Sequence, residues 1–211
     1  MDFDHDRYKV YTWRNFMMLH WIINPGLAIN ELLLGQRVPR VSLEDKQSDR
    51  PRYERSFIPC PHCGTHHDSR TWSPQNGTAF RNWFGLYCPS CGEVIPCLTN
   101  VTSWLVLAAT YPLWGWFRRP LRESWLRRQP ARFAQLDLES VPDPFAGRGW
   151  IAQGLSWGLF MFVVMTFLFP PLIGDPITGR SILVGIPIWA LGGLGFGYSM
   201  KWFMGRKGKT G

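Results

Sequence analysis

Two long runs of apolar residues near the C-terminus dominate the hydrophobic pattern of the chain. Residues 150–173 contain no charged side chain over 24 positions, and residues 181–200 form a second uncharged run. A helix rises about 1.5 Å per residue, so each run can cross a hydrocarbon core of about 30 Å. The seven residues between them, "GDPITGR", are suited to a turn. The pattern predicts a transmembrane helical hairpin; the alternative is a buried helix pair in a soluble protein.

Each of the two runs contains a pair of glycines four residues apart. The first run holds Gly154 and Gly158, and the second holds Gly193 and Gly197. Small residues at this spacing let helix backbones approach closely inside a membrane. We therefore predict that these glycines pack the hairpin on itself or on another subunit, although glycine is also simply frequent in membrane helices.

A third apolar stretch, residues 101–117, is interrupted by Tyr111-Pro112. Its 17 residues are at the lower limit for a membrane span. Arginines are frequent on both sides of it, and short basic loops remain on the cytoplasmic side of a membrane. We expect an interfacial or re-entrant element that bends at Pro112. In the alternative arrangement this stretch and residues 16–34 both cross, which would place the cysteine-rich region outside.

Residues 11–35 predict two short helices that are separated at Asn24-Pro25. Asparagine is a favourable N-cap, proline is favourable at the first helical position, and Gly35 can end a helix in the left-handed conformation. A helix of about ten residues reaches only about 15 Å, too short to cross. Four polar residues interrupt the apolar surface of residues 11–35: His20, Asn24, Asn30 and Glu31. We expect an element that lies on the membrane or re-enters it.

The segment "RRPLRESWLRRQPARF", residues 118–133, alternates arginine with leucine, tryptophan and phenylalanine. It predicts a basic amphipathic helix, bound either to an anionic membrane surface or to a protein neighbour. The candidate binding residues are Arg118, Arg119, Arg122, Arg127 and Arg128. The net charge of +8 could also indicate nucleic acid. With membrane spans present, arginines beside the membrane explain that charge more economically.

Four of the five cysteines form two similar turns, Cys60-Pro-His-Cys63-Gly and Cys88-Pro-Ser-Cys91-Gly. Two residues between thiolates allow one turn to present both sulfurs to a single ion, and the following glycine permits the positive φ of such a turn. The N-terminus does not have the pattern of a signal peptide, so we expect reduced thiols. The sequence predicts one structural Zn²⁺ per chain, held by these four cysteines, with iron as the alternative metal. The fifth, Cys97, is expected to be a small buried residue.

The two cysteine turns resemble the paired knuckles of the zinc-ribbon family over about residues 57–97. The resemblance implies a small β ribbon, and the 24 residues between the turns would hold a β-hairpin with "NWFGLY" as one strand. A four-cysteine site is coordinatively closed, which argues against metal catalysis. Beside the first turn lie His62, His66, His67 and Asp68. These residues either form a second binding site beside the cysteines or are simply polar residues exposed on the surface of the ribbon.

A nucleic-acid partner is disfavoured for the cysteine region. Residues 58–97 contain only Arg70 and Arg81 as strong cations, against Asp68 and Glu93. A surface that follows a phosphate backbone concentrates lysine and arginine on the binding module itself. The aromatic residues of this region are instead expected to form a small core and a docking face.

Together these patterns predict a mixed fold, an α-helical membrane protein with a small β zinc ribbon. The predicted segments are 1–57 with interfacial helices, 58–97 with the ribbon, 98–148 with a re-entrant or short membrane helix and a basic segment, and 149–211 with the hairpin. This layout resembles uncharacterised bacterial membrane proteins that pair a zinc ribbon with a C-terminal hairpin. The resemblance implies the cytoplasmic membrane of a bacterium and no particular activity.

The sequence contains no nucleotide-binding loop, no paired carboxylates and no charged residue inside the two clear spans. We therefore expect a non-enzymatic accessory, assembly or scaffolding subunit of a larger membrane complex, with membrane lipid and other subunits as partners. The first alternative is an interfacial enzyme or lipid-handling protein that uses His20, Asn24, Asn30 and Glu31. The second is a regulator or sensor that acts through the ribbon.

Overall fold

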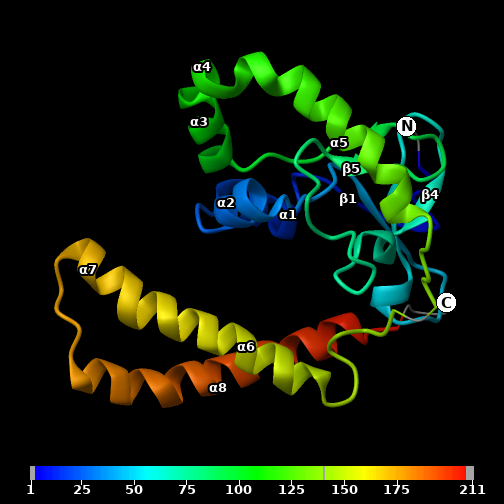
Figure 1. Ribbon diagram of the computed structural model, residues 1–211. Coiled ribbons are helices and arrows are strands. Elements are labelled where there is room, and N and C mark those ends of the chain that lie inside the picture. Colours follow the sequence, from blue (N-terminus) through cyan, green and yellow to red (C-terminus); the bar gives the residue numbers. More distant parts are fainter. Residues whose placement is uncertain (1–2, 140, 208–211) are drawn as a thin grey trace. The chain divides into compact units, whose positions relative to one another are not determined.

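The computed structural model describes residues 3–139 and 141–207, and the chain forms two compact units (Figure 1). The first, here called the N-terminal unit, comprises the described residues up to Arg50 and from Glu54 to Val141. The second, the hairpin unit, comprises Pro51–Tyr53 and Pro142–Lys207. Within the hairpin unit, the short segment is joined to the last described residue by a β-bridge between Pro51 and Lys207.

A four-stranded antiparallel sheet in the N-terminal unit follows the order of the sequence. Its strands are β1 (Tyr8–Tyr11), β2 (Ser42–Asp45), β3 (Ser56–Pro59) and β4 (His66–Asp68). Tyr8 faces Asp45, Leu43 faces Phe57, and Ile58 faces His67. The short 3₁₀ helices η2 (Arg52–Glu54) and η3 (Ser69–Trp72) flank β3 and β4 along the chain. The sheet thus joins the N-terminal segment to the cysteine region, and β3 extends across the segment boundary expected at residues 57 and 58.

A second sheet consists of two antiparallel strands, β5 (Leu86–Tyr87) and β6 (Val94–Ile95). Only the last two residues of the expected strand "NWFGLY" are therefore extended and paired. Gly85 has a φ of +125°, and a Cβ there would lie 2.9 Å from the carbonyl oxygen of Ile95. Glycine is suited to position 85 because a residue with a side chain fits poorly at that conformation and approach.

The helices near the N-terminus are short, as expected. They are α1 (Phe16–Ile23), α2 (Leu27–Ile29) and the π-helical turn η1 (Asn30–Leu34). Gly35 ends η1 with a φ of +65°, in agreement with the predicted left-handed end. The second helix begins at Leu27 rather than Pro25, because the side chain of Asn24 accepts a hydrogen bond from the Gly26 amide and holds residues 24–26 in a turn.

The third apolar stretch is divided into two helices, α3 (Val101–Ala109) and α4 (Tyr111–Trp114), followed by the 3₁₀ turn η4 (Gly115–Phe117). Asn100 caps α3, since its side-chain oxygen accepts from the amide of Thr102 at 2.9 Å. The helix ends at Ala109, and its C-cap, Thr110, lies two residues before the predicted bend at Pro112. The nine residues of α3 span about 14 Å, less than half of a bilayer core.

The basic segment forms one helix, α5 (Arg118–Phe133), over the range that the sequence indicates. Trp125, Gln129 and Phe133 lie one turn apart and are buried. Trp125 and Phe133 pack with Tyr87 of β5 in one hydrophobic cluster, and the Trp125 indole donates to the carbonyl oxygen of Arg81 at 2.7 Å. One face of α5 therefore packs on the chain's own cysteine-bearing region. The five candidate arginines remain exposed.

The hairpin unit contains two helices long and apolar enough to cross a membrane, Gly149–Ile173 and Gly179–Met204. The first is assigned as α6 (Gly149–Val163), the π-helical η5 (Val164–Leu168) and α7 (Phe169–Ile173), and the second is α8 (Gly179–Met204). Thr178 and Ser181 form a reciprocal capping box at the start of α8. Many apolar side chains face outward, including Leu172 at 82% and Leu183 at 73% exposure. This exposure disfavours the alternative of a helix pair buried in a soluble core.

The four candidate packing glycines lie where α6 and α8 approach each other. A Cβ added at Gly154 would collide with the carbonyl of Gly193, and one at Gly197 would lie 3.0 Å from the Cα of Gly154. Gly158 is placed against Trp189 and Gly193. The helices therefore meet backbone to backbone at the positions of these glycines.

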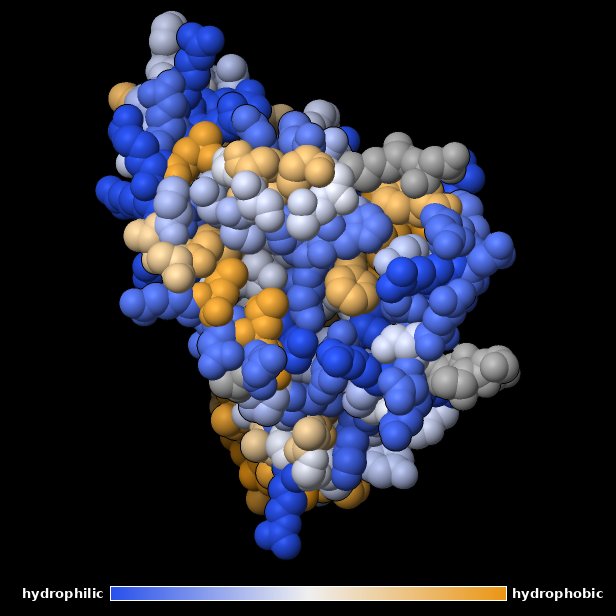
Figure 2. Space-filling model, turned by 90° about the vertical axis from the view of Figure 1, so that its right-hand side faces the viewer, coloured by the Kyte–Doolittle hydropathy of each residue, from blue (hydrophilic) through white to orange (hydrophobic). Residues whose placement is uncertain are grey.

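The N-terminal unit also leaves large apolar side chains exposed, mainly on its helices. They include Phe16 and Ile23 of α1, Leu33 of η1, Leu113 of α4 and Trp116 of η4. The face shown in Figure 2 is mostly hydrophilic, with hydrophobic residues in small groups. Large apolar side chains exposed in this way suit an interaction surface.

Candidate metal centre

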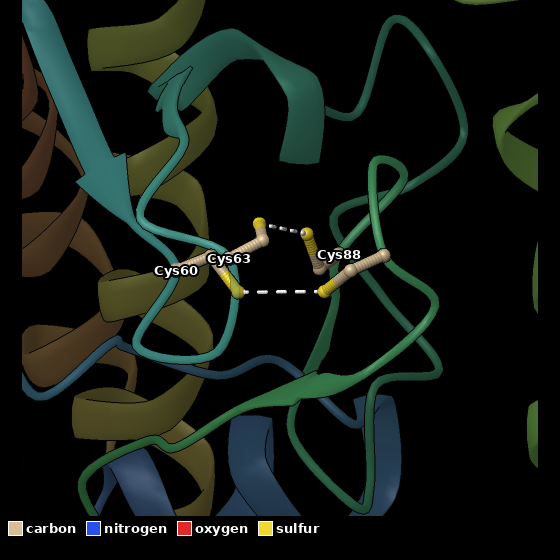
Figure 3. Close-up of side chains that lie close together, drawn as sticks. Cys60, Cys63 and Cys88 are labelled. Carbon is tan, nitrogen blue, oxygen red and sulfur yellow. Dashed lines mark hydrogen bonds between the residues drawn. The ribbon is translucent and has the colours of Figure 1, made fainter.

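The four paired cysteines come together at one point in the N-terminal unit. Their ligand atoms all lie within 4.8 Å of one another, with 3.7 Å between the sulfurs of Cys60 and Cys91 and 3.8 Å between those of Cys63 and Cys88 (Figure 3). A regular tetrahedron of sulfurs about 2.3 Å from a central Zn²⁺ has edges of about 3.8 Å. A disulfide would require about 2.05 Å, and all four thiols are free. The donor set and its spacing fit a tetrahedral metal ion such as zinc.

Each cysteine pair occupies the tip of its own β-hairpin. The β3–β4 hairpin presents Cys60 and Cys63, and the β5–β6 hairpin presents Cys88 and Cys91. This corrects the expectation of one hairpin between the two turns. The reason is that each turn reverses the chain by itself, so the strands that enter and leave it pair with each other.

The two turns share one backbone pattern. The amide of Gly64 donates to the carbonyl of Cys60 at 3.0 Å, and the amide of Gly92 donates to the carbonyl of Cys88 at 2.9 Å. Both glycines have a positive φ, +73° and +78°, as the sequence predicts. The conformation is suited to glycine because a Cβ would be strained there. The repeated motif in the sequence thus corresponds to a repeated turn in the structure.

The four thiols have different surroundings. Cys60 and Cys88 are buried, whereas Cys63 and Cys91 are exposed. Burial raises the pKa of Cys60, and it raises the pKa of Cys88 to about 12, although nearby backbone amides act in the opposite direction. A buried thiolate is costly without a compensating charge, so a bound cation would stabilise the deprotonated form of these two residues.

Cys63 is the contrasting case. Its sulfur lies 3.3 Å from the hydroxyl oxygen of Thr65, and hydrogen bonding to Thr65 lowers the pKa of Cys63 to about 6. This thiol is therefore largely a thiolate at neutral pH. It is ready to accept a metal ion without first losing a proton.

His67 lies beside the cluster rather than in it. Its Nε2 is 3.1 Å from the sulfur of Cys88, the side chain is buried, and its ring meets the edge of Trp72 at 5.8 Å. Burial lowers the pKa of His67, which favours a neutral ring. When Nε2 carries the ring proton, this N–H donates a hydrogen bond to the Cys88 sulfur. A hydrogen bond of this kind, from a residue that is not itself a ligand, orients a metal ligand.

The other polar residues beside the first turn have separate contacts. Asp68 forms an ion pair with Arg70 at 2.8 Å, and the ring of His66 stacks edge-on with Tyr8. Over residues 3–139 and 141–207, the four cysteines are the group of side chains placed to hold a metal ion. His62, His66, His67 and Asp68 do not form a second such group there. Cys97 lies outside the cluster, partly buried against its core, and burial raises the pKa of its thiol to about 12.

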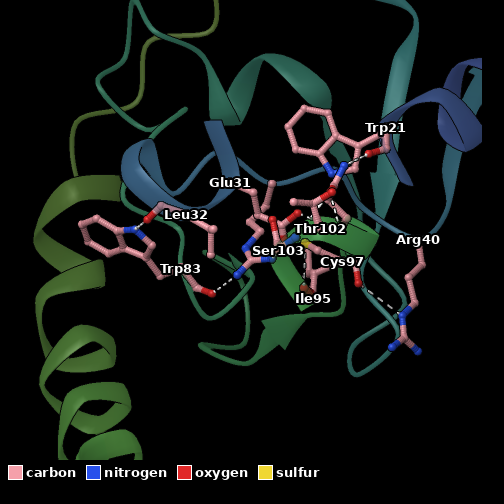
Figure 4. Close-up of polar contacts among 11 residues, drawn as sticks. Trp21, Glu31, Leu32, Arg40, Trp83, Ile95, Cys97, Thr102 and Ser103 are labelled. Carbon is pink, nitrogen blue, oxygen red and sulfur yellow. Dashed lines mark hydrogen bonds and ion pairs between the residues drawn. The ribbon is translucent and has the colours of Figure 1, made fainter. Parts of the chain in front are cut away.

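The polar residues expected at the membrane surface lie in two places. His20 and Asn24 are within 3.2 Å of each other near the end of α1, whereas Glu31 is fully buried in η1 and forms an ion pair with Arg37. Glu31 also accepts a hydrogen bond from the backbone amide of Asn100 at 2.8 Å. Figure 4 shows this buried polar region between η1 and the start of α3.

Asn100 connects α1, η1 and α3, and the sequence-based predictions do not include it. Its side-chain nitrogen donates to the carbonyls of Trp21 and Asn24, both at 2.7 Å, while its oxygen caps α3. Arg37, the ion-pair partner of Glu31, is also held in place, because it donates hydrogen bonds to the carbonyl of Trp83 as well as to Glu31. An asparagine just before an apolar helical run is an N-cap signal, so the cap could have been found from the sequence. Its contacts with α1 could not.

Residues 11–107 match a family described as a domain of unknown function (DUF8250). The match includes α1, η1, all four clustered cysteines and most of α3, and it ends before α5 and the two long helices of the hairpin unit. Comparisons with curated proteins and with solved structures find no match. The cysteine cluster and the short N-terminal helices therefore both lie within the matched residues.

Proposed function

We propose that the chain is a non-enzymatic membrane protein that serves as an accessory, assembly or scaffolding subunit of a larger membrane complex. The observation that carries the proposal is the closed arrangement of four cysteine sulfurs. Four protein ligands leave no position on the metal for water or substrate, so the centre would stabilise structure rather than catalyse a reaction.

In this proposal one Zn²⁺ per chain binds Cys60, Cys63, Cys88 and Cys91 in a zinc-ribbon module. Zinc is favoured over iron because the sequence carries no other sign of electron transfer. The module would fix the geometry of the elements that pack on it. Support comes from α5, whose buried face lies against Tyr87 of the second hairpin.

The hairpin unit would anchor the chain in the cytoplasmic membrane of a bacterium, with the cysteine module on the cytoplasmic side. Lys201 and Arg206 lie at the end of α8, and Arg148 precedes α6. The turn at residues 174–178 would then face outward, in accordance with the distribution of positive charge that orients membrane helices. Other membrane subunits and lipid are the expected partners, and nucleic acid is not.

The decisive experiment is purification of the tagged chain in a mild detergent, followed by identification of proteins that co-purify in fixed ratio. A stable complex with other membrane proteins is the expected result. A chain that migrates alone as a 24.4 kDa monomer under conditions that preserve other complexes would contradict the proposal.

The interfacial enzyme alternative is tested most cleanly at His20. This residue is exposed, so His20→Ala leaves the buried network around Glu31 intact. Loss of cellular function with normal assembly of the complex would favour that alternative. The regulator alternative predicts instead that changes on the exposed surface of the module abolish function while zinc stays bound.

A further inference from the structure

A cavity of about 690 Å³ lies in the N-terminal unit between its short helices and α5. Its walls are largely aromatic and aliphatic: Leu32 of η1, Trp83 and Phe84, five residues of α3 and α4, and Leu121 of α5. The volume is in the range of pockets that hold small organic ligands.

Two of the tryptophans that line the cavity have their indole N–H groups satisfied by the protein. The indole of Trp83 donates to the carbonyl of Leu32 at 3.1 Å, and that of Trp114 donates to the carbonyl of Leu107 at 3.2 Å. With these donors satisfied by the protein, the rings offer only their apolar faces to a ligand. The cavity therefore suits a hydrocarbon chain.

The charged residues of the lining favour an anion. Glu31 and Arg37 neutralise each other, and Arg118 is an additional cation, exposed at the start of α5. The lining thus carries one net positive charge, which an oxygen-rich anionic group could neutralise.

The outer surfaces of the same helices are also apolar. Leu113 of α4 is 78% exposed and Trp116 of η4 is 86% exposed, and Arg119 and Arg122 follow within two turns. An apolar, tryptophan-bearing surface that adjoins arginines is typical of an element in the interface of an anionic membrane. A hydrocarbon chain with an anionic head would therefore reach the cavity directly from the bilayer.

We propose that this cavity binds one anionic phospholipid, with an acyl chain between α3–α4 and Trp83–Phe84 and the phosphate at Arg118. The occupant is a lipid rather than a peptide because the charge complement, the aromatic lining and the exposed apolar exterior all match a membrane lipid. This binding site goes beyond a scaffolding role, and it does not require the cysteine cluster to hold zinc.

Two adjacent alanines on α3 provide a matched test. Both are exposed, but only Ala108 lines the cavity. Ala108→Trp should fill the space, whereas Ala109→Trp adds the same group outside it. Arg118→Gln removes the head-group cation, and Arg127→Gln is its control on the same helix, exposed and outside the lining.

The full chain is reconstituted in vesicles of phosphatidylglycerol and phosphatidylcholine in equal amounts, extracted in a mild detergent and weighed by native mass spectrometry. We expect one retained phosphatidylglycerol per chain in the parent protein and in both controls, and its loss in Ala108→Trp. In Arg118→Gln the preference for phosphatidylglycerol should fall about fivefold, the effect of one arginine at an anionic surface.

Three results would overturn the proposal. The first is equal lipid retention by Ala108→Trp and Ala109→Trp. The second is retention without preference for the anionic lipid in the parent protein, which indicates ordinary boundary lipid. The third is a parent protein that carries no lipid, the outcome expected if a segment of another protein fills the cavity.

Discussion

At the residue scale, the two cysteines of each pair differ although their sequence contexts repeat. The first cysteine of each turn, Cys60 or Cys88, is buried in the hydrophobic cluster formed with Ile58, Leu86 and Ile95. The second cysteine of each turn is exposed. The strands before each turn cause this difference, since they carry the first cysteine into the space between the hairpins. Within each four-residue turn, one cysteine is thus shielded from water, which disfavours its thiolate, and the other is exposed to water.

The low pKa of Cys63 leads to a pH-dependent prediction for the metal-free protein. With a pKa of about 6, Cys63 is a thiolate above that pH and is protonated below it, while burial keeps Cys88, with a pKa of about 12, in the thiol form. Iodoacetamide at pH 7 should therefore alkylate Cys63 well before Cys88. The rate at Cys63 should fall as the pH drops from 7 to 5.

Peptide mass spectrometry after timed alkylation measures both rates. Thr65→Val removes the hydroxyl beside the sulfur and should raise the pKa of Cys63, so the pH at which its rate falls should rise. Equal rates at Cys63 and Cys88, or no shift in Thr65→Val, would contradict this account.

Glu31 provides a second prediction at this scale. Glu31→Ala leaves the Arg37 guanidinium and the Asn100 amide without their buried partner. Breaking a buried ion pair by removal of one side costs about 3–5 kcal/mol. We expect a loss of that order in the free energy of unfolding of the N-terminal unit, measured by urea denaturation in detergent.

Glu123→Ala is the control for Glu31, because Glu123 is exposed on α5. Its effect should stay within about 0.5 kcal/mol, as is usual for surface substitutions. Similar small effects at both positions would show that the Glu31 network contributes little to stability.

At the element scale, α6 and α8 depend on glycine for their close approach. All four packing glycines, Gly154 and Gly158 on α6 and Gly193 and Gly197 on α8, would place a Cβ against the backbone of the opposite helix. Gly192 and Gly195, also on α8, have open space around them. A glycine of α8 is therefore needed for helix packing only where its position faces the backbone of α6.

Gly193→Leu and Gly192→Leu form a matched pair for this interface. Both changes raise intrinsic helix propensity by about the same amount, so a difference between them reports packing. Gly193→Leu should destabilise the helix pair by about 1–3 kcal/mol, the usual cost of overpacking, and Gly192→Leu should not.

The measurement is an SDS titration of the detergent-solubilised protein, with hydrogen exchange followed separately in α6 and α8. Gly193→Leu should lose protection at a lower SDS fraction than the parent protein. Coincident curves for the two variants would mean that the helices do not pack through Gly193.

At the scale of the whole molecule, the two units have different sources of stability. The N-terminal unit has short strands, and its cluster around the cysteines contains only five buried side chains. A core this small is marginal without a cross-link or a metal. The hairpin unit consists of two long helices whose backbone hydrogen bonds are satisfied within each helix.

Removal of the metal should therefore affect the two units unequally. A strong chelator, or Cys88→Ser, should reduce hydrogen-exchange protection in β3 to β6 and loosen α5, which packs on Tyr87. Protection in α6 and α8 should remain. Metal content is measured on the same samples, with one zinc per chain expected before treatment.

Cys97→Ser is the control for metal removal, because Cys97 lies outside the cluster. It should retain its metal and its protection pattern. Full protection of β3 to β6 in metal-free protein would contradict a structural role for the ion, and loss of protection in α6 and α8 would contradict the independence of the units.

Short-range patterns in the sequence were sufficient to predict several elements. The cysteine spacing predicted two tight turns with glycine at positive φ, and the uncharged runs predicted two helices of membrane length. Gly35 predicted the end of η1, and the basic segment predicted the range of α5. These features depend on the chemistry of residues within one or two turns of each other, which a single sequence records directly.

The remaining features were decided by tertiary structure, because they join residues that are distant along the chain. Glu31 and Asn100 are 69 positions apart and are joined by a hydrogen bond. Glu31, which the sequence indicated as a residue at the membrane surface, is therefore buried and holds η1 to the start of α3. The buried face of α5 is likewise defined by Tyr87 and Arg81, which a helical pattern does not identify. The sequence by itself determined the two paired cysteine turns and the two membrane-length helices, since spacing and hydropathy are local properties. Only the folded chain determined which polar groups are satisfied and which apolar walls enclose a cavity, since both require partners from separate elements.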